Sequence, residues 1–190
     1  MLRGEKVEIV PAKIGDKKKV FKWLCNSETT KNHMGPPHFD DHPVPTWEEF
    51  CMDFEDYYFD GAKPNYGRVF IIKHDDEEIG AICYASFHLF STRAELDIWM
   101  ESERNCGKGL GTEAIILLCN YLKNNGIDKF FIRPSRRNAR AVRAYEKVGF
   151  MKVADKEKNT VIEQYIKKEY LETYGAGDYG KGDDVVLIKE

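Results

Sequence analysis

The chain has 190 residues, of which 42% are apolar and 32% are charged, and its net charge is −3. This composition is typical of a folded soluble protein and excludes intrinsic disorder, and the length favours one domain over residues 1–190. No apolar run is long enough to cross a bilayer, and the charged start of the chain is unlike a signal peptide. The five cysteines are scattered, which favours reduced thiols in the cytoplasm over a disulfide frame or a zinc site.

Periodicity and turn residues predict a mixed α/β chain. The predicted strands cover residues 7–10, 68–73, 79–89, 94–100, 127–132, 150–153 and 185–189. The predicted helices cover residues 16–26, 112–124, 138–148 and 160–171, and a further helix starts at a capping box formed by Thr46 and Glu49. Hairpins make the first half antiparallel, whereas the helical crossover makes strands 94–100 and 127–132 parallel.

Charge is distributed unevenly along the chain. Residues 32–62 contain eight acids and neither lysine nor arginine, whereas residues 104–152 contain eleven basic residues and three acids. This asymmetry suggests one segment near cations and another near anions, although two solvated faces explain it equally well. His38 and His42 are four residues apart, but prolines make their segment a loop, and no metal site is expected there.

The most informative local pattern is the glycine run at residues 104–112, between a predicted strand and a predicted helix. A glycine-rich turn that opens a helix presents unpaired backbone N–H groups and the positive end of the helix dipole, which favours a phosphorylated ligand. The alternating glycines match neither the dinucleotide fingerprint nor the P-loop.

The run does match the pattern Arg/Gln-x-x-Gly-x-Gly/Ala, as Arg104-Asn105-Cys106-Gly107-Lys108-Gly109. It resembles the acyl-coenzyme A pyrophosphate loop of the GNAT superfamily of N-acetyltransferases. A second block, residues 138–150, resembles that superfamily's Asn-x-x-Ala…Tyr-x-x-x-Gly-Phe motif. The resemblance implies a mixed, mostly antiparallel sheet with helices on both faces. It also implies a bulged strand at 94–100 that splays from its parallel neighbour at the cofactor site.

The resemblance implies that acetyl-CoA is the co-substrate and that no metal is needed. Backbone N–H groups of residues 107–112 are expected to hold the pyrophosphate of acetyl-CoA. A cluster of arginines is expected to bind the 3′-phosphate or the adenine of the same molecule. That cluster comprises Arg133, Arg136, Arg137, Arg140 and Arg143. The full set of expected cofactor-binding residues is Ile98, Trp99, Met100, Arg104, Gly107, Lys108, Gly109, Leu110, Gly111, Thr112, Asn138, Arg140, Ala141 and Tyr145.

Amine acetylation needs a group that takes a proton from the amine and a donor for the departing thiolate. Along strand 94–100, Glu95, Asp97 and Trp99 share one face. We expect Asp97 to be the base, because an extended pantetheine held at Gly107 reaches it, and Glu95 is the alternative. Tyr145 is the candidate proton donor.

Among GNAT enzymes, the region is most similar to the aminoglycoside 6′-N-acetyltransferases, which carry an aspartate ten residues before the position of Gly107. Their block with the spacing of residues 134–150 is also similar. The resemblance implies a small cationic acceptor, such as an aminosugar in antibiotic resistance, received by the acids of residues 40–60. Ribosomal-protein N-terminal acetyltransferases share the cofactor motifs and stay an alternative, as does a non-catalytic acyl-CoA-binding module. Neither nucleic acid nor membrane is an expected partner, and the protein is a monomer or a homodimer.

Overall fold

The computed structural model describes residues 1–30, 44–177 and 184–190. Eight strands form one sheet in the order β1-β2-β3-β4-β5-β6-β8-β7, and every neighbouring pair is antiparallel except β5–β6. The mixed, mostly antiparallel sheet is therefore confirmed. The strands are β1 (Leu2–Arg3), β2 (Glu8–Pro11), β3 (Gly67–His74), β4 (Glu77–Ala85), β5 (Arg93–Met100), β6 (Lys129–Ile132), β7 (Met151–Lys152) and β8 (Leu187–Lys189).

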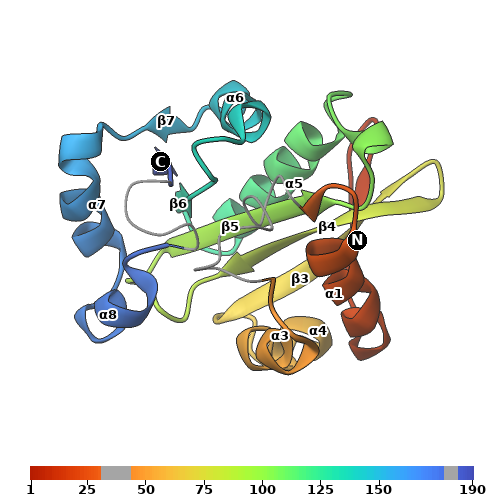
Figure 1. Ribbon diagram of the computed structural model, residues 1–190, viewed down its shortest axis with the longest axis horizontal. Helices are drawn as coiled ribbons and strands as arrows, with labels where there is room; N and C mark the ends of the chain where they lie inside the picture. Colours follow the sequence, from red (N-terminus) through yellow and green to blue (C-terminus); the bar gives the residue numbers. More distant parts are fainter. Residues whose placement is uncertain (31–43, 178–183) are drawn as a thin grey trace.

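Helices cover both faces of the sheet, with α5 and α6 on one side and α1, α3 and α4 on the other (Figure 1). The helices are α1 (Lys17–Asn26), α3 (Trp47–Asp53), α4 (Tyr57–Asp60), α5 (Leu110–Asn124), α6 (Ala139–Lys147), α7 (Lys158–Tyr165) and α8 (Leu171–Tyr174). Short 3-10 turns are η1 (Ile14–Asp16), η2 (Glu103–Asn105), η3 (Asp155–Glu157) and η4 (Lys168–Tyr170).

The alternation predicted for β5 is observed in the two main cores. Leu96 and Met100 are buried in the core under α5, and Ile98 packs against it. Trp99 is buried in the other core, beneath α1, α3 and α4. Successive side chains on a strand point to opposite faces, so both faces of β5 are apolar except where Glu95 and Asp97 interrupt the pattern. Packing in the two cores does not explain Glu95 and Asp97, so these two residues of β5 are candidates for function.

Several boundaries follow local backbone chemistry. The capping box of α3 is formed, because Thr46 Oγ1 accepts from Glu49 N at 3.2 Å and Glu49 Oε2 accepts from Thr46 N at 2.8 Å. The β3–β4 hairpin turns at Asp75 and Asp76, which both have positive φ as a type I′ turn requires. Strand β4 ends at Ala85, shorter than predicted, because residues after it form a turn closed by Leu89 N donating to Ser86 O.

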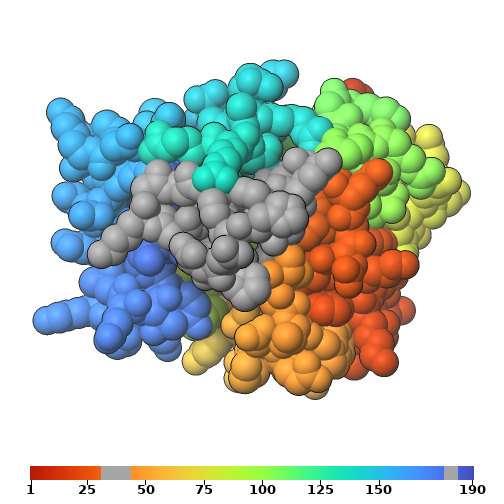
Figure 2. Space-filling view, in the orientation of Figure 1, coloured from red at the N-terminus to blue at the C-terminus, as the bar shows by residue number. Residues whose placement is uncertain are grey.

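The C-terminal part differs most from the sequence prediction. The helix expected at residues 160–171 ends at Tyr165, because Ile166 is extended and forms an antiparallel bridge with Leu89. The chain then turns through η4 into α8, and β8 inserts between β6 and β7. On the face shown in Figure 2, α8 (blue) and helices α3 and α4 (orange) lie on the same side of the molecule. Strand β1 was not predicted, since two residues carry too short a pattern.

Candidate functional site: a cavity along the splayed strands

Strands β5 and β6 form a parallel pair along only part of the length of β5. The register of the pair runs from Arg93–Lys129 to Glu95–Phe131, and β6 ends at Ile132 while β5 continues to Met100. Pro134 follows, and a proline has no N–H to continue the ladder. The splay implied by the resemblance is therefore present. The bulge is not, because β4 and β5 pair without a register shift from Gly80–Met100 to Ala85–Glu95.

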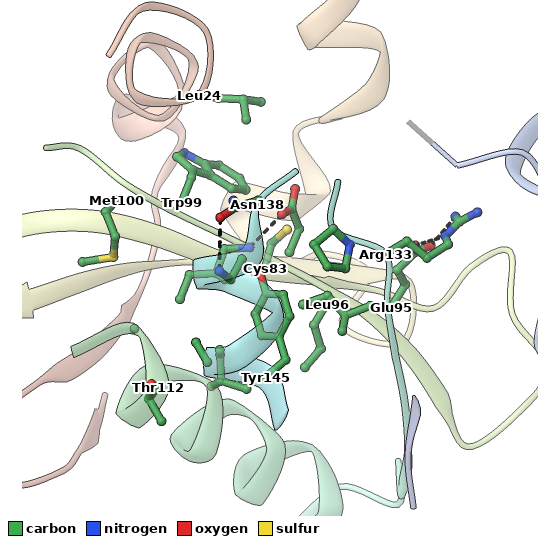
Figure 3. A pocket seen from close by; sticks show the side chains of 18 of the residues that line it. Leu24, Cys83, Glu95, Leu96, Trp99, Met100, Thr112, Arg133, Asn138 and Tyr145 are labelled. Carbon is green, nitrogen blue, oxygen red and sulfur yellow. Dashed lines mark hydrogen bonds and ion pairs between the residues drawn. The ribbon is translucent and has the colours of Figure 1, made fainter. Parts of the chain in front are cut away.

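A cavity of about 1300 Å³ follows this splay (Figure 3). We call one part of it the glycine-loop end, lined by Gly107, Gly109, Gly111 and Thr112 beside Ile98 and Met100. We call the other part the His88 end, lined by Phe87, His88, Glu95, Arg133, Thr173 and Tyr174. Figure 3 shows Thr112 and Met100 on one side of Tyr145, and Glu95 with Arg133 on the other. Asp97 lies between the two ends in the sequence of β5.

At the glycine-loop end the backbone itself is the binding group. Gly107 and Gly109 have φ of +75° and +83°, in the left-handed region that favours glycine. In the described part of the chain, the N–H groups of residues 107–112 have no hydrogen-bond acceptor. They open α5, a helix of 15 residues, so its dipole adds to them. Unpaired donors at a helix start fit a pyrophosphate.

A cation that no sequence motif indicates, Lys6, lies at the same loop. The Lys6 ammonium is 3.8 Å from where a Cβ on Gly109 would stand, and Lys6 lines the cavity. Its backbone N donates to Glu113 Oε1 at 3.0 Å, which ties the segment between β1 and β2 to α5. Because more than a hundred residues separate Lys6 from Glu113, no local motif could reveal this contact.

Most of the expected cofactor-binding residues line the cavity, but three do not. Those that do are Ile98, Trp99, Met100, Gly107, Gly109, Gly111, Thr112, Asn138, Arg140, Ala141 and Tyr145. Leu110 points into the core, with 2% of its surface exposed, and Arg104 forms ion pairs with Glu77 and Glu101 at 3.3 Å. Lys108 is outside the lining as well. For these three, a backbone N–H is the group that can reach a ligand, so a role for the side chains is not supported.

Some backbone groups in this set are already engaged: the Met100 carbonyl accepts a hydrogen bond from the buried Thr29 hydroxyl, and the Ile98 N–H donates to Asp97 Oδ1. Asn138 has a structural role, since its side chain accepts from Ala141 N at 3.1 Å and caps α6. Met100, Ile98 and Asn138 still line the cavity. For Asn138, the expected alternatives of cap and cofactor contact are compatible.

The predicted arginine cluster does not exist as one patch. Arg143 and Arg140 line the cavity, and Arg140 is paired with Glu103 at 2.6 Å. Arg136 is paired with Asp155 at 2.9 Å, away from the lining. Arg133 is at the His88 end. Arg133 and Arg136 are therefore engaged by carboxylates of the chain, whereas Arg140 and Arg143 in the cavity lining stay candidates for the 3′-phosphate or the adenine.

The two expected catalytic side chains lie close enough to influence each other. Tyr145 is 5% exposed, and burial raises the pKa of its hydroxyl, which the Asp97 carboxylate raises further. The Tyr145 hydroxyl therefore stays protonated at neutral pH. Asp97 is exposed, and its Oδ1 accepts from Ile98 N at 2.8 Å. A carboxylate and a protonated phenol thus flank the splay.

Glu95, the alternative base, is held in a buried ionic network. Arg133 donates to its Oε1 at 2.7 Å and to its Oε2 at 3.0 Å, and His88 Nε2 lies 2.8 Å from Oε2. Burial alone raises the pKa of Glu95, but Arg133 and His88 outweigh it and hold the pKa at about 2. Such a carboxylate is a poor proton acceptor, so Glu95 is not suited to be the base.

Helices α3 and α8 supply the walls of the His88 end. Tyr174 and Thr173 come from α8, and Asp53 and Phe54 from the end of α3. Burial, with a smaller contribution from Glu49, raises the pKa of Asp53. Among the described acids of residues 44–62, Asp53 lines this cavity. Asp40 and Asp41, with the histidine pair His38 and His42, lie outside the described residues.

No group of three or more metal-ligating side chains comes together within residues 1–30, 44–177 and 184–190. Across the same ranges, no helix has the length and apolar content needed to span a membrane.

Residues 6–151 match the family model described as an acetyltransferase (GNAT) domain. The chain belongs to the GNAT acetyltransferase family. That assignment agrees with the glycine loop, the splayed parallel pair and the N–H groups without acceptors at the α5 start.

A relative in Bacillus subtilis (strain 168), the uncharacterized N-acetyltransferase YobR, is 37% identical over 143 residues. The match covers 70% of this chain and 57% of YobR, so this chain spans little more than half of that relative. Among solved structures, aminoglycoside acetyltransferase AAC(6′)-Ib in complex with coenzyme A is 18% identical, with a TM-score of 0.62 over 96% of this chain and 94% of that one.

RimL, a ribosomal L7/L12 α-N-protein acetyltransferase in complex with coenzyme A, is 15% identical. Its TM-score is 0.66 over 98% of this chain and 94% of that one. At these identities, both solved structures show the GNAT fold alone, and the aminoglycoside enzyme is no nearer than the ribosomal one. The acceptor must therefore be argued from this chain's own residues.

Proposed function

We propose that this GNAT protein transfers the acetyl group of acetyl-CoA to a primary amine of a small cationic acceptor, such as an aminosugar. The observation that carries the proposal is the placement of Asp97 and Tyr145 at one cavity, between a backbone anion site and a pocket that contains Asp53. The anion site suits the phosphates of coenzyme A, and the carboxylate suits a cationic acceptor.

The chemistry follows from what each side chain can do. Bound acetyl-CoA supplies the activated acetyl group. Asp97 takes a proton from the acceptor ammonium, so the nitrogen lone pair can attack the acetyl carbon. The Tyr145 hydroxyl, kept protonated by burial and by Asp97, gives its proton to the sulfur as the carbon–sulfur bond breaks. The backbone N–H groups of β5 beyond Glu95, where β6 no longer pairs with it, are the candidate donors to the carbonyl oxygen, although the Ile98 N–H is bonded to Asp97 Oδ1 at 2.8 Å.

The walls of the His88 end favour a small acceptor over a protein terminus. Tyr174 and Thr173 of α8 line the same cavity as Asp53 and Phe54 at the end of α3. Burial raises the pKa of Tyr174 most, and Asp53 is close enough to raise it further. Arg133 holds α8 in place by donating to Tyr174 O at 2.7 Å. A pocket walled from both sides accommodates a compact molecule, and Asp53 supplies a negative charge for a second cationic group of that molecule.

The test is an acetylation assay with three amines of different classes: kanamycin, spermidine and a tripeptide with a free N-terminal serine. Thiol release and the mass of each product are measured with and without acetyl-CoA. We expect acetylated kanamycin or spermidine and little tripeptide product. Turnover of the tripeptide alone would assign the protein to the N-terminal class. Tight coenzyme A binding without any product would support a non-catalytic binding module.

A further inference from the structure

The imidazole of His88, beside the proposed acceptor pocket, has one ring nitrogen, Nδ1, that takes no part in the Glu95 network. His88 lines the cavity with 2% of its surface exposed, and its Nδ1 is buried without a hydrogen-bond partner in the described part of the chain. The other ring nitrogen, Nε2, lies 2.8 Å from Glu95 Oε2. A carboxylate accepts, so Nε2 carries the proton of this hydrogen bond, and in the neutral imidazole Nδ1 is then the acceptor nitrogen.

The ring is held from several sides, so the position of Nδ1 is fixed. Arg133 binds both oxygens of Glu95, and its third donor reaches Tyr174 O at 2.7 Å. The His88 carbonyl accepts from Lys167 N at 3.0 Å, which anchors the backbone. This network needs only Nε2. A buried acceptor nitrogen without a donor destabilises the fold, and a purely structural role for His88 does not explain that cost.

The surroundings of the ring point to a ligand. The Tyr174 ring lies 5.0 Å from the imidazole at 31°, and the Phe87 ring lies 4.8 Å away. The charged groups facing the ring are Glu95 from β5 and Arg133 after β6, while Lys167 Nζ donates to Phe87 O. None of these donates to Nδ1. An aromatic wall with one unused acceptor is suited to a ligand with an apolar face and a hydroxyl or amine N–H.

We propose that His88 determines acceptor specificity, because Nδ1 accepts a hydrogen bond from a second polar group of the acceptor. The inference rests on the proposed function. Glu95 and Asp97 are two residues apart on one face of β5, roughly 7 Å. A group bound at His88, beyond Glu95, is therefore several bonds from the nitrogen that reacts at Asp97. The preferred acceptor class is an amine that carries a second hydrogen-bond donor, such as a polyhydroxylated aminosugar, rather than a plain alkylamine.

Two substitutions separate the nitrogens of His88. His88→Gln places an amide N–H where Nε2 was, so it keeps the donor to Glu95 but removes the acceptor at Nδ1. His88→Asn places a carbonyl oxygen where Nδ1 was, and it gives up the bond to Glu95. The probes are kanamycin, which carries many hydroxyl groups, and hexylamine, which has no second donor. Both are assayed for KM and kcat, with acetyl-CoA affinity and melting temperature as controls.

We expect His88→Gln to raise the KM for kanamycin about tenfold, the loss of one hydrogen bond, and to change the KM for hexylamine by less than about threefold, with the same affinity for acetyl-CoA. His88→Asn should keep the kanamycin KM within about threefold, despite a lower melting temperature. An unchanged kanamycin KM in His88→Gln, with the loss confined to His88→Asn, would overturn the inference.

Ring ¹⁵N spectra of His88 separate this inference from the proposed function, because they need no turnover. With the protein saturated in coenzyme A, adding kanamycin should move the Nδ1 signal towards its hydrogen-bonded value and leave Nε2 in place. Kanamycin that is not acetylated but moves Nδ1 contradicts the proposed acceptor chemistry and supports the subsite. An unmoved Nδ1 signal contradicts the subsite whether or not acetylation occurs.

Discussion

The two ends of the cavity are built in opposite ways. The glycine-loop end comes from neighbouring stretches of sequence, and its binding groups are backbone N–H groups at the start of α5. The His88 end is assembled from α3, the turn after β4, Arg133 and α8, and its polar groups are side chains. A site made of backbone leaves a glycine pattern that can be read locally, whereas a site made of distant side chains leaves none.

The two ends also differ in whether their charged side chains form ion pairs. At the glycine-loop end, Lys6 lies beside backbone donors that have no acceptor, and it has no ion-pair partner in the described part of the chain. At the His88 end, Arg133 and Glu95 neutralise each other in a buried pair. The first arrangement leaves positive charge available for phosphates. The second makes the fold itself depend on the charges, so substitutions should affect binding at one end and stability at the other.

Breaking the buried pair should have the largest effect on stability. Arg133→Met leaves Glu95 buried without its partner, and we expect a loss of about 3–5 kcal/mol in the free energy of unfolding. Arg143→Met is the matched control, because Arg143 is exposed, and its loss should stay within about 0.5 kcal/mol. Chemical denaturation measures both. Equal losses would mean that the two ends do not differ in this respect.

The same pair predicts a pH dependence of stability. The folded pKa of Glu95 is lowered from 4.5 to about 2, so its contribution is present above the unfolded value and is lost as pH falls towards 2. The contribution is roughly 3 kcal/mol. The stability difference between the native protein and Glu95→Gln should therefore shrink between about pH 4.5 and pH 2. A difference that stays constant over this range contradicts the assignment.

At the glycine-loop end, backbone conformation should be decisive. Gly109 has φ of +83°, and an alanine there costs about 1–2 kcal/mol and tilts the N–H groups that open α5. We expect Gly109→Ala to lower the melting temperature and weaken acetyl-CoA binding in calorimetry. Gly15→Ala is the control, since Gly15 has open space around it and no positive φ. If both variants bind acetyl-CoA like the native protein, the loop is not the phosphate site.

The smallest effect is expected at Lys6. Its ammonium acts from the surface, so Lys6→Ala should raise the KM for acetyl-CoA only about threefold, and the increase should fade at high salt. Lys18→Ala, on the exposed side of α1, is the control and should leave the KM unchanged. A salt-independent increase would mean that Lys6 contributes through packing of its segment against Glu113.

The sequence predicted what local chemistry determines. The α5 start and the Asn138 cap each depend on residues within one or two turns of chain, and the structure contains both, whereas the splayed pair was expected from the family resemblance. Residue alternation also predicted that Glu95 and Trp99 share the face opposite Leu96. These features follow from strand period, glycine conformation and helix capping, which a single sequence displays.

What failed depends on contacts between distant segments. The sequence left Glu95 as an alternative base because its network with Arg133 and His88, which lowers its pKa, joins three segments that are far apart in the chain. Arg133 looked like a phosphate ligand for the same reason. The wall formed by α8 could not be foreseen, because the extended residue Ile166 ends α7 only through its bridge to Leu89. Tertiary pairing of this kind leaves no periodic signal in the sequence.

The central claim is that the two ends meet at Asp97, which serves the reaction and not the binding of acetyl-CoA. The most direct test measures turnover and acetyl-CoA affinity in Asp97→Asn, with kanamycin and spermidine as acceptors. We expect kcat to fall by about 10²–10⁴, as for loss of a general base, while calorimetry shows an unchanged affinity for acetyl-CoA. Native turnover in Asp97→Asn, or a loss of acetyl-CoA affinity that accounts for the whole decrease, would contradict the claim.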